Sequence, residues 1–366
     1  MADRQLRIGV DGRELTGQPT GVGRYLESIL REWSHDASFR HQVTIFAGGG
    51  TPPPVVRDDP RFVWRVLAAP KAGTWWEQTT LARAVNGADL DVFFAAGYTA
   101  PLRLACPLVV AIYDVSFFAH PEWFSAREGW RRRWLTRSAA RRARRVVTIS
   151  DFSASEIVHW LGIPRDRVVI ARPGGPAPLD SGSAMSRPPV VLFVGSIFTR
   201  RHVPELIQAF ARAATRVPDA KLVLVGANRS QPRIDPRALA QAAGVGGKVE
   251  WREYVPDAEL DQLYAGARVF AFLSDYEGFG LTPLEAIAHG VPPVLIDTPI
   301  AREIFGEAAR LVPLDVDRIA AAIVELLSDA NANAALAATG RRRLGQYSWT
   351  QAAATVRQAL EAAASR

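Results

Sequence analysis

The chain has 366 residues, of which 48% are hydrophobic and 22% are charged, so it is globular and long enough for two domains with separate cores. Its single cysteine, Cys106, excludes an internal disulfide framework and favours a reducing cytoplasm. Residues 1–6 contain no apolar signal-peptide core, and no stretch approaches the length of an uncharged membrane span, so we expect neither an export signal nor a transmembrane helix.

The charge is basic and unevenly distributed. Lysine and arginine together number 44 against 37 acidic residues, a net charge of +7. Residues 127–145 alone contain nine arginines in 19 positions. Such a concentration indicates either an anionic surface or ligand as partner, or a solvated helix face.

The first half of the chain alternates apolar runs with helical segments. Strands are predicted at residues 6–11, 43–47, 62–66, 91–95 and 108–114, and helices at 25–33 and 74–85. This alternation predicts a parallel α/β sheet, whose ligand crevice lies at the carboxyl ends of the strands. Tyr113 and Asp114 lie at such an end.

A glycine-bearing loop at residues 16–25 leads from the first strand into a helix. Gly21 and Gly23 could contact a ligand phosphate or simply form a turn, and the residues alone leave both readings open. The loop is not a dinucleotide-binding fingerprint, because Leu26 stands where the third glycine belongs.

Residues 123–145 mix aromatic side chains with the arginine cluster. Trp130 and Trp134 are four residues apart and therefore share a helix face. Aromatic and basic residues together suit the interface of an anionic membrane, whereas a buried aromatic stripe with a solvated basic face is the alternative. Nucleic acid is the weakest of the readings, because no nucleic-acid-binding motif accompanies the segment.

The second half follows a strand at 145–150, a helix capped near Ser150, and a segment rich in Pro, Gly and Ser that we take as a linker. Further strands are predicted at 190–196, 222–226, 267–273, 294–297 and 311–313, with helices at 206–214, 257–264, 317–327, 331–344 and 349–364. Arg200 and Arg201 come just after the strand at 190–196, where they can neutralise a diphosphate without a metal.

Residues 274–293 form the most informative stretch. Gly278 and Gly280 allow a tight turn after a strand, and we expect a helix with Thr282 as N-cap and Glu285 completing a capping box. A helix start of this kind is an anion site. The alternative is that Glu285 only caps its own helix and Glu277 is a solvated loop acid.

The whole string, E-G-F-G-L-x-x-L-E-A followed by G-x-P, resembles the donor-site signature of retaining glycosyltransferases with the GT-B fold, glycosyltransferase family 4. The resemblance implies that Glu285 holds the ribose of a nucleotide sugar and that Glu277 lies by the transferred sugar. It also implies that the backbone amides of Gly280, Leu281 and Thr282 meet phosphate, and that Gly278 and Phe279 belong to the same donor-binding site.

Other segments extend the resemblance. The family's V-G-x-x-x-x-R-K pattern matches at Arg200, while Arg201 stands in for the lysine, so both are implied to bind phosphate. Tyr254 and Val255 match the segment that borders the nucleotide base, and Gly21 and Gly23 match the loop that faces the donor phosphates.

One position departs from the family. A histidine usually precedes the aspartate that corresponds to Asp114, and here Tyr113 stands in its place. A tyrosine hydroxyl can donate a hydrogen bond but carries no positive charge near neutral pH, which puts a histidine-like role in doubt.

The resemblance implies a GT-B fold: two Rossmann-like domains with parallel sheets facing across a cleft. We predict an acceptor-side domain at residues 1–178, a linker at 179–189, a donor-binding domain at 190–345, and a C-terminal helix at 346–366 that packs back on the first domain. The implied reaction is metal-independent transfer of a sugar, with retention, from a nucleotide diphosphate sugar to a glycan or lipid-linked glycan. The implied catalytic residues are Glu277, Arg200, Arg201 and Asp114.

No cofactor is implied beyond the donor itself, whose product is GDP or UDP. The region of His120 to Trp123 resembles mannosyltransferases and favours GDP-mannose. We expect a cytoplasmic protein, with attachment to the inner face of the cell membrane left open. Two rival functions remain: a nucleotide-sugar enzyme that transfers nothing, such as an epimerase, and an inactive membrane-associated scaffold.

Overall fold

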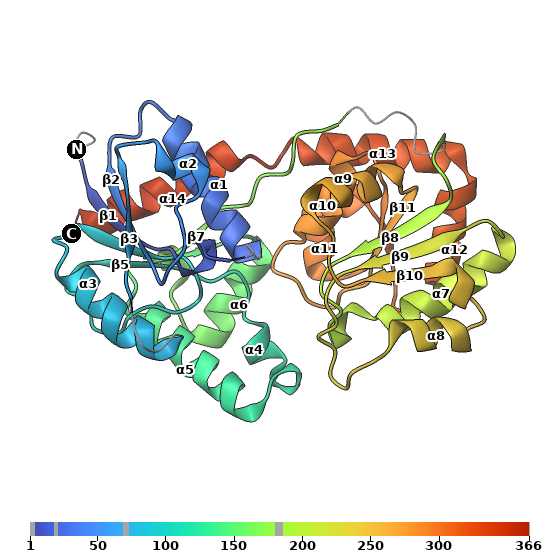
Figure 1. Ribbon diagram of the computed structural model, residues 1–366, viewed down its shortest axis with the longest axis horizontal. Coiled ribbons are helices and arrows are strands. Elements are labelled where there is room, and N and C mark those ends of the chain that lie inside the picture. The colour runs from blue at the N-terminus through green and yellow to red at the C-terminus, as the bar shows by residue number, and fades with distance from the viewer. Residues whose placement is uncertain (1–3, 18–20, 69–72, 180–185, 366) are drawn as a thin grey trace. The chain divides into compact units, whose positions relative to one another are not determined.

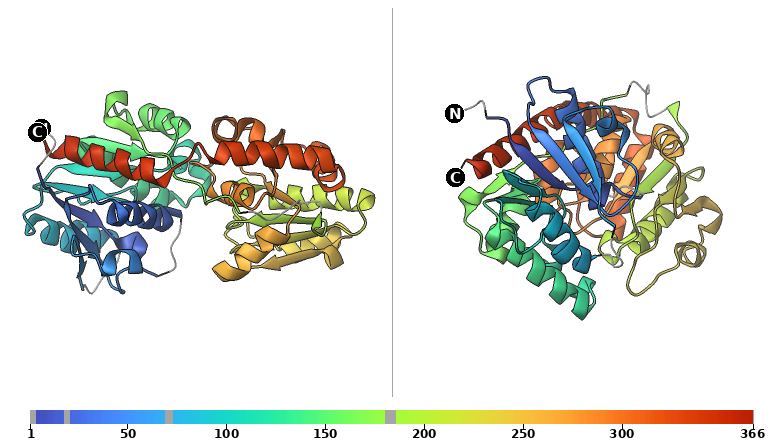
Figure 2. Two further views of the ribbon diagram at one scale, coloured as in Figure 1. Left: turned by 90° about the horizontal axis from the view of Figure 1, so that it is seen from above. Right: turned by 60° about the vertical axis from the view of Figure 1, so that its left-hand side comes forward.

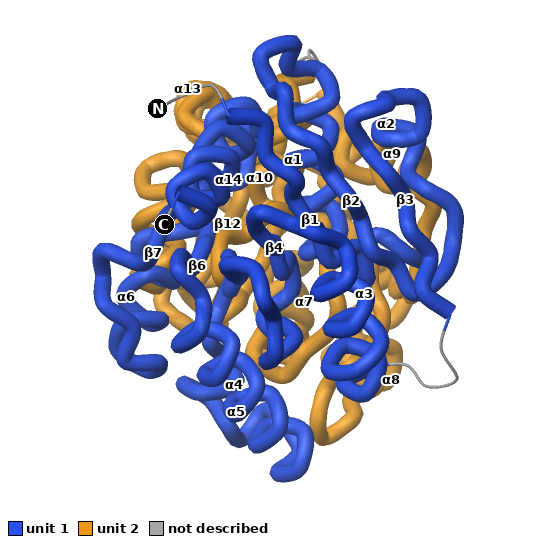
Figure 3. The backbone as a smooth tube through the Cα atoms, turned by 90° about the vertical axis from the view of Figure 1, so that its left-hand side faces the viewer, with its two compact units in different colours: residues 1–174, 348–366 blue, residues 175–347 orange. Residues whose placement is uncertain are grey.

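The computed structural model describes residues 4–17, 21–68, 73–179 and 186–365. The chain forms two compact units: residues 1–174 with 348–366 make unit 1, and residues 175–347 make unit 2 (Figure 3). Of the predicted linker, residues 180–185 lie outside the described part of the chain.

Unit 1 is built on a seven-stranded parallel sheet in the order β3-β2-β1-β4-β5-β6-β7. Its central strands are buried on both faces, which explains why they read as continuous apolar runs rather than alternating ones. The strands are β1 (Arg7–Asp11), β2 (Gln42–Ala47), β3 (Phe62–Val66), β4 (Val92–Ala95), β5 (Leu108–Ala111), β6 (Arg145–Thr148) and β7 (Val168–Ile170).

Helices cover both faces of this sheet (Figure 1). One face carries α1 (Gly21–His35), α2 (Pro54–Arg57) and α14 (Trp349–Ala364). The other carries η2 (Trp76–Leu81), α3 (Ala82–Asn86), α5 (Ala126–Arg142) and α6 (Asp151–Leu161), with α4 (Ser116–Ala119) and η3 (Pro121–Trp123) before α5.

The C-terminal helix α14 belongs to unit 1, although unit 2 precedes it in the chain. The Trp33 indole of α1 donates a hydrogen bond to the Ala353 carbonyl of α14 at 3.0 Å, and Val356 and Leu360 are fully buried. Figure 2 shows α14, in red, lying along unit 1. The predicted return of this helix to the first domain is confirmed.

Unit 2 contains a six-stranded parallel sheet in the order β10-β9-β8-β11-β12-β13. Its strands are β8 (Val190–Val194), β9 (Lys221–Val225), β10 (Val249–Arg252), β11 (Val269–Phe272), β12 (Pro293–Ile296) and β13 (Arg310–Val312). One face is covered by α7 (Val203–Arg216), α8 (Pro236–Ala242) and α12 (Val316–Ser328), the other by α9 (Asp257–Gly266), α10 (Leu281–Ala288), α11 (Pro299–Ile304) and α13 (Ala330–Leu344).

The two parallel sheets with helices on both faces confirm the predicted fold class. Several elements differ in detail. The helix expected at 74–85 is interrupted by a π-helical stretch, η2, and the short helices α8 and α11 were not predicted. The short helices α4 and η3, between β5 and α5, were not predicted either.

No single helix in the described part of the chain has both the length and the apolar composition to cross a membrane. Residues 316–328 and 330–364 meet that measure only as a pair, with a bend of 96° between them.

Candidate active site

Each sheet has one position where the strand order reverses direction, and ligands of such sheets bind outside the carboxyl ends of the strands there. In unit 1 this position lies between β1 and β4, and in unit 2 between β8 and β11. Arg200 and Arg201 follow β8, and Glu277 follows β11. The topology therefore places these predicted residues at the switch point of unit 2.

Arg201 lies on the short helix η6 (Thr199–Arg201) and folds back over the end of β8. Its Nη1 donates to the Ser196 carbonyl at 3.0 Å, and its guanidinium carbon lies 4.8 Å from the centre of the Phe272 ring. Gly195 makes this possible: its φ is +146°, and a Cβ there would lie 2.6 Å from Nη1 of Arg201. A side chain at 195 would displace the guanidinium.

Glu277 pairs with Arg201. Oε1 of Glu277 accepts from Arg201 Nε at 3.0 Å and from the Ser274 hydroxyl at 2.9 Å, and it lies 2.9 Å from Arg201 Nη2. Both side chains are largely but not fully buried, with 13% and 20% of their surface exposed. The structure thus brings together two predicted site residues that are 76 positions apart.

Arg200 lies beside this pair. Its guanidinium carbon is 4.3 Å from the centre of the Phe198 ring, and its backbone carbonyl accepts from the Asp275 amide at 3.0 Å. The β8 and β11 connections are therefore tied together by backbone as well as by side chains.

Helix α10 begins two residues earlier than predicted. Its N-cap is Gly280, with φ of 99°, and no side chain caps it, so the predicted capping box of Thr282 and Glu285 is wrong. Glu285 instead accepts a hydrogen bond from the Tyr264 hydroxyl at 2.8 Å. The reason is the left-handed backbone at Gly280, which starts the helix before Thr282 can act as cap. The first amides of α10 lack intrahelical acceptors, as in any helix, so an anion site at this helix start stays a prediction.

His202 is a neighbour of this site that the sequence did not single out. It has a left-handed φ of 46°, and its Nε2 lies 2.6 Å from Oδ2 of Asp275, while its Nδ1 lies 3.6 Å from Oε2 of Glu205. Burial alone would lower the pKa of His202, but the hydrogen bonds and charges of Asp275 and Glu205 outweigh it and raise that pKa to about 9. His202 is therefore a third cation beside Arg200 and Arg201 at neutral pH. No local pattern could reveal it, since Asp275 is 73 positions away.

Tyr254 and Val255 lie in the connection between β10 and α9. Tyr254 is 64% exposed, whereas Val255 is buried. Because β10 is the edge strand, two positions from β8, these residues lie to one side of the Arg201–Glu277 pair.

In unit 1, the glycines of the first loop form the start of a helix. Gly21 opens α1 with no atom near the place of its missing side chain, and Gly23 is buried in the first turn. Residues 18–20 of this loop lie outside the described residues.

Asp114 is fixed at the end of β5 by two hydrogen bonds. Its Oδ2 accepts from the Tyr98 hydroxyl at 2.7 Å, and its Oδ1 accepts from the Ser116 amide at 2.9 Å. Tyr98 has a φ of 62°, which is strained for a residue with a large side chain. Desolvation and the Asp114 carboxylate raise the pKa of Tyr98, so the hydroxyl stays protonated as the donor.

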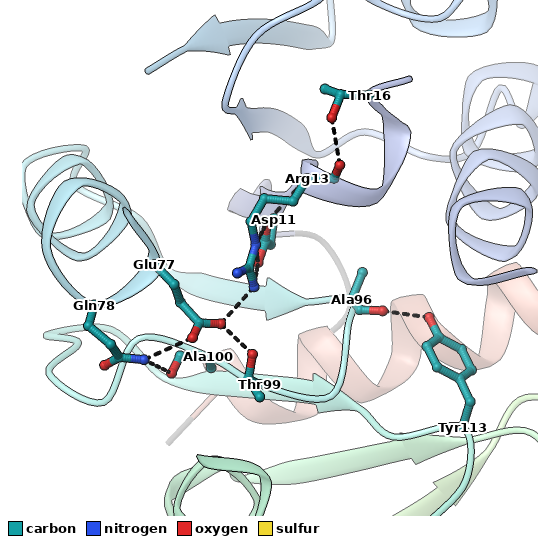
Figure 4. Close-up of polar contacts among 9 residues, drawn as sticks. All are labelled: Asp11, Arg13, Thr16, Glu77, Gln78, Ala96, Thr99, Ala100 and Tyr113. Carbon is teal, nitrogen blue, oxygen red and sulfur yellow. Dashed lines mark hydrogen bonds and ion pairs between the residues drawn. The ribbon is translucent and has the colours of Figure 1, made fainter. Parts of the chain in front are cut away.

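Tyr113, which replaces the family's histidine, is buried, and its hydroxyl donates to the Ala96 carbonyl at 2.7 Å (Figure 4). Burial raises the pKa of Tyr113 well above its usual value. The Tyr113 hydroxyl stays protonated and donates its proton to the Ala96 carbonyl. This agrees with the doubt that Tyr113 takes a histidine-like role.

A buried cluster of charged side chains lies at the end of β1, and no pattern in the sequence predicts it (Figure 4). Arg13 Nη2 lies 2.6 Å from both Oδ2 of Asp11 and Oε1 of Glu77, and these two carboxylates are 3% and 1% exposed. Burial works to lower the pKa of Arg13, but Asp11 and Glu77 outweigh it and raise it. Glu77 also accepts from the Thr99 hydroxyl at 2.5 Å and from the Gln78 amide at 3.0 Å.

This cluster ties three segments together: the end of β1 with the residues just after it, the π-helical stretch η2 and the β4–β5 connection. Interruptions of this kind within helices frequently occur at functional sites. Glu77 lies on η2, so a local departure from α-helix places the carboxylate under Arg13.

Across the described ranges, no group of three or more His, Cys, Asp or Glu side chains is arranged to hold a metal ion.

Comparison with known proteins gives two family matches that follow the two units. Residues 19–174 match the family model described as Glycosyltransferase Family 4, and residues 181–343 match the one described as Glycosyl transferases group 1.

Two curated relatives illustrate the similarity. The chain is 29% identical to the O-antigen chain mannosyltransferase B of Escherichia coli over 273 residues, which cover 70% of this chain and 71% of that protein. It is 28% identical over 372 residues to the GDP-mannose-dependent alpha-(1-6)-phosphatidylinositol monomannoside mannosyltransferase of Mycolicibacterium smegmatis, covering 93% and 94% of the two chains.

Solved structures share the fold at low sequence identity. Anabaena HepE in complex with UDP and glucose superposes with a TM-score of 0.74 at 19% identity, covering 98% of this chain and 100% of that one. WaaG, a glycosyltransferase involved in lipopolysaccharide biosynthesis, superposes with a TM-score of 0.73 at 15% identity, covering 97% and 99%.

Proposed function

Since the chain belongs to glycosyltransferase family 4 and transfers a sugar from a nucleotide sugar, we propose that the switch point of unit 2 holds the donor's diphosphate. The observation that carries the proposal is the convergence of Arg200 and Arg201, after β8, with the turn into α10, after β11. Guanidinium groups and helix amides are the groups that bind phosphate in proteins.

The chemistry follows from charge. When the bond between the sugar and the diphosphate breaks, the electron pair leaves with the diphosphate, so negative charge develops on its oxygens. Preorganised cations and amide dipoles stabilise that charge more than they stabilise the bound donor, which lowers the barrier. Arg200, Arg201 and the start of α10 act in this way, and we assign no metal to the step.

The Arg201–Glu277 pair implies a rearrangement on donor binding. Without donor, Glu277 neutralises Arg201. A diphosphate competes for the same guanidinium, which frees the Glu277 carboxylate to accept hydrogen bonds from the sugar hydroxyls. Glu285, whose carboxylate accepts a hydrogen bond from Tyr264, then binds the ribose hydroxyls of the donor. Tyr254 and Val255 border the nucleotide base.

In unit 1 we propose Asp114 as a further catalytic residue, with Gly21 and Gly23 in the loop that approaches the donor phosphates. Asp114 is suited to orient a hydroxyl, because two hydrogen bonds hold its carboxylate in place.

GDP-mannose is the proposed donor, and a glycan or lipid-linked glycan the proposed acceptor. The support is that relatives covering most of this chain are mannosyltransferases, one of them named for a GDP-mannose donor. These relatives are 28–29% identical to this chain, and the identity of the donor is tested by the following experiment. We propose the cytoplasmic side of the cell membrane as the place of action.

Thermal-shift measurements with GDP, UDP, GDP-mannose and UDP-glucose test the donor, because a ligand that binds only the folded state raises its melting temperature. We expect GDP and GDP-mannose to stabilise the protein and the Arg201→Ala variant to lose that effect. The matched control is Arg212→Ala, whose side chain is half exposed and pairs with the exposed Asp317. Stabilisation by none of the nucleotides, or an equal loss in both variants, contradicts the proposed site. Conversion of the donor to an epimer without acceptor would point to the rival enzyme class.

A further inference from the structure

Unit 1 exposes three tryptophans. Trp75, Trp130 and Trp134 are 44%, 65% and 51% exposed, against 1% for the core residue Trp33. The alternative of a buried aromatic stripe at Trp130 and Trp134 is therefore wrong. Large exposed aromatic side chains are uncommon on soluble proteins, and when clustered they mark interaction sites.

Trp130 and Trp134 lie together on α5. Their rings are stacked, with centroids 6.5 Å apart and planes 11° from parallel. The opposite side of the helix is buried, where Leu135, Ala139 and Ala140 pack into the core. The stacked pair therefore points away from the sheet.

Trp75 belongs to the same surface. Nη1 of Arg131, on α5, donates to the hydroxyl of Thr74 at 2.6 Å. Thr74 precedes Trp75 in the chain, so this hydrogen bond holds the segment of Trp75 against α5. We call the surface formed by these exposed residues the Trp–Arg face; its members are Trp75, Arg127, Trp130, Arg131, Trp134, Arg141 and Arg142.

The charge of this face has one sign. Helix α5 contains seven arginines and a single acid, Glu128, which pairs with Arg132 at 2.7 Å. Arg127, Arg141 and Arg142 are exposed and form no ion pair with any described residue. At 100° per residue, positions 127, 130, 134 and 141 fall within one sector of the helix surface. Two tryptophans, flanked along the helix by two arginines, thus share a single exposed strip.

We propose that the Trp–Arg face docks on the surface of an anionic lipid bilayer. Indole rings favour the boundary between headgroups and acyl chains, because one part of the ring is apolar and the N–H is polar. Arginines on the same strip meet the lipid phosphates, and the attraction falls off within a Debye length. The presence of both residue types on one exposed strip, with no acidic residue on that strip, is complementary to such a surface.

The inference goes beyond the proposed reaction and does not rest on it, because lipid binding can be measured without donor or acceptor. The test is co-sedimentation of the full-length protein with vesicles of phosphatidylcholine alone and of phosphatidylcholine with phosphatidylglycerol. We expect binding to the anionic vesicles only, a loss of binding at high salt, and a blue shift of tryptophan fluorescence on binding.

Two variants identify the surface. Trp130→Ser with Trp134→Ser removes the stacked pair, and Arg127→Gln with Arg131→Gln and Arg141→Gln removes three charges; each should weaken vesicle binding roughly tenfold or more. The matched control replaces three exposed arginines of unit 2 by glutamine: Arg212, Arg216 and Arg318. It should bind vesicles like the wild type.

Melting temperatures and the stabilisation by donor nucleotide show whether each variant is folded, and these should not change. Absence of binding to anionic vesicles, or an equal loss in the control, would overturn the inference. A dimer would also overturn the inference if the tryptophan substitutions dissociate it and leave vesicle binding unchanged. The Trp–Arg face would then be an interface between two copies of the chain. Salt-sensitive binding to an RNA oligonucleotide without vesicle binding would overturn it as well.

Discussion

Arg201 and Glu277 form an ion pair that is only partly exposed. Glu277 accepts hydrogen bonds from Arg201 Nε and from the Ser274 hydroxyl, and hydrogen bonds to charged groups are stronger than neutral ones. These contacts hold the Arg201 guanidinium in one orientation, and under the proposed function a donor phosphate would replace the Glu277 carboxylate there.

The first prediction concerns the fork of Arg201. Arg201→Lys keeps the charge but loses the paired N–H donors, so we expect kcat/KM for the donor to fall about 10- to 100-fold, the equivalent of roughly 1.5–3 kcal/mol for a charged hydrogen bond. Steady-state kinetics with varied donor measure it. Arg212→Lys is the control and should leave kcat/KM unchanged. An Arg201→Lys enzyme as fast as the wild type would show that the fork is not needed.

The second prediction concerns pH. The pKa of His202 is raised above its unfolded value of about 6.5 to about 9, so its contribution to stability is fully present below about pH 6.5 and is lost as the pH rises through about 9. Because the site is partly solvated, we expect a loss of roughly 1–2 kcal/mol between pH 6.5 and 9. Urea denaturation across this range measures it, and His202→Gln should flatten the slope. An identical pH dependence in the variant would exclude His202 as the source.

The third prediction concerns the buried cluster of Asp11, Arg13 and Glu77. Glu77→Ala leaves Arg13 with one buried partner and the Thr99 hydroxyl without its acceptor, so we expect a destabilisation of about 3 kcal/mol. The control is Glu128→Ala, which removes an exposed pair and should cost less than about 1 kcal/mol. Urea-denaturation midpoints compare them. Equal effects in the two variants would mean that the buried cluster is not stabilising.

At the scale of elements, the ends of strands decide the geometry of the site. β8 and β11 are neighbours, so the loops that follow them meet, and Gly195 at the end of β8 lets the Arg201 guanidinium fold back over the backbone. Gly226, at the end of β9, has a φ of 141°, and a Cβ there would lie 2.2 Å from the Gly195 carbonyl oxygen. Side chains at positions 195 and 226 would therefore disturb the close packing that follows β8 and β9.

The fourth prediction tests that packing. Gly195→Ala places a Cβ 2.6 Å from Arg201 Nη1 on a backbone that side chains rarely adopt, so we expect the loss of stabilisation by donor nucleotide together with a lower melting temperature. Gly247→Ala is the control, because nothing lies within 4 Å of its Cβ position and its φ is ordinary. Nucleotide binding retained by Gly195→Ala would show that Arg201 can bind from another position.

At the scale of the whole molecule, the chain completes unit 1 only at its end. Helix α14 packs against α1 and covers the sheet, and its buried face includes Val356 and Leu360. Unit 1 is therefore not a continuous segment of sequence, and its core is complete only with residues that follow unit 2 in the chain.

The fifth prediction follows. Deletion of residues 348–366 removes the acceptor of the Trp33 indole hydrogen bond and exposes apolar surface along α1, so we expect unit 1 to lose its cooperative unfolding transition. Unit 2 should still bind nucleotide, which intrinsic fluorescence during urea denaturation and thermal shifts with GDP can separate. A truncated chain that unfolds like the full chain would show that α14 contributes little.

Sequence patterns within a few residues were enough to predict the buried strands and one helix cap. Apolar runs with β-branched residues predicted the buried strands of both sheets, and Ser150 was correctly expected near a helix start, where its hydroxyl accepts from the Ser153 amide. The parallel direction of the strands followed from the alternation of strands and helices, whereas the structure gave the strand order. The prediction of Thr282 as a helix cap was wrong, because Gly280 adopts a left-handed conformation and becomes the N-cap itself.

What the chain alone determined was the fold class, the position of the arginines and glutamates at strand ends, and the family. What only the tertiary structure decided was which of these groups touch: Arg201 with Glu277, His202 with Asp275, Arg13 with Glu77, and whether Trp130 and Trp134 face the core or the solvent. The physical reason is range. Backbone preferences act over a few residues and leave a periodic trace, whereas an ion pair across 64 or more positions depends on where the strands bring its partners.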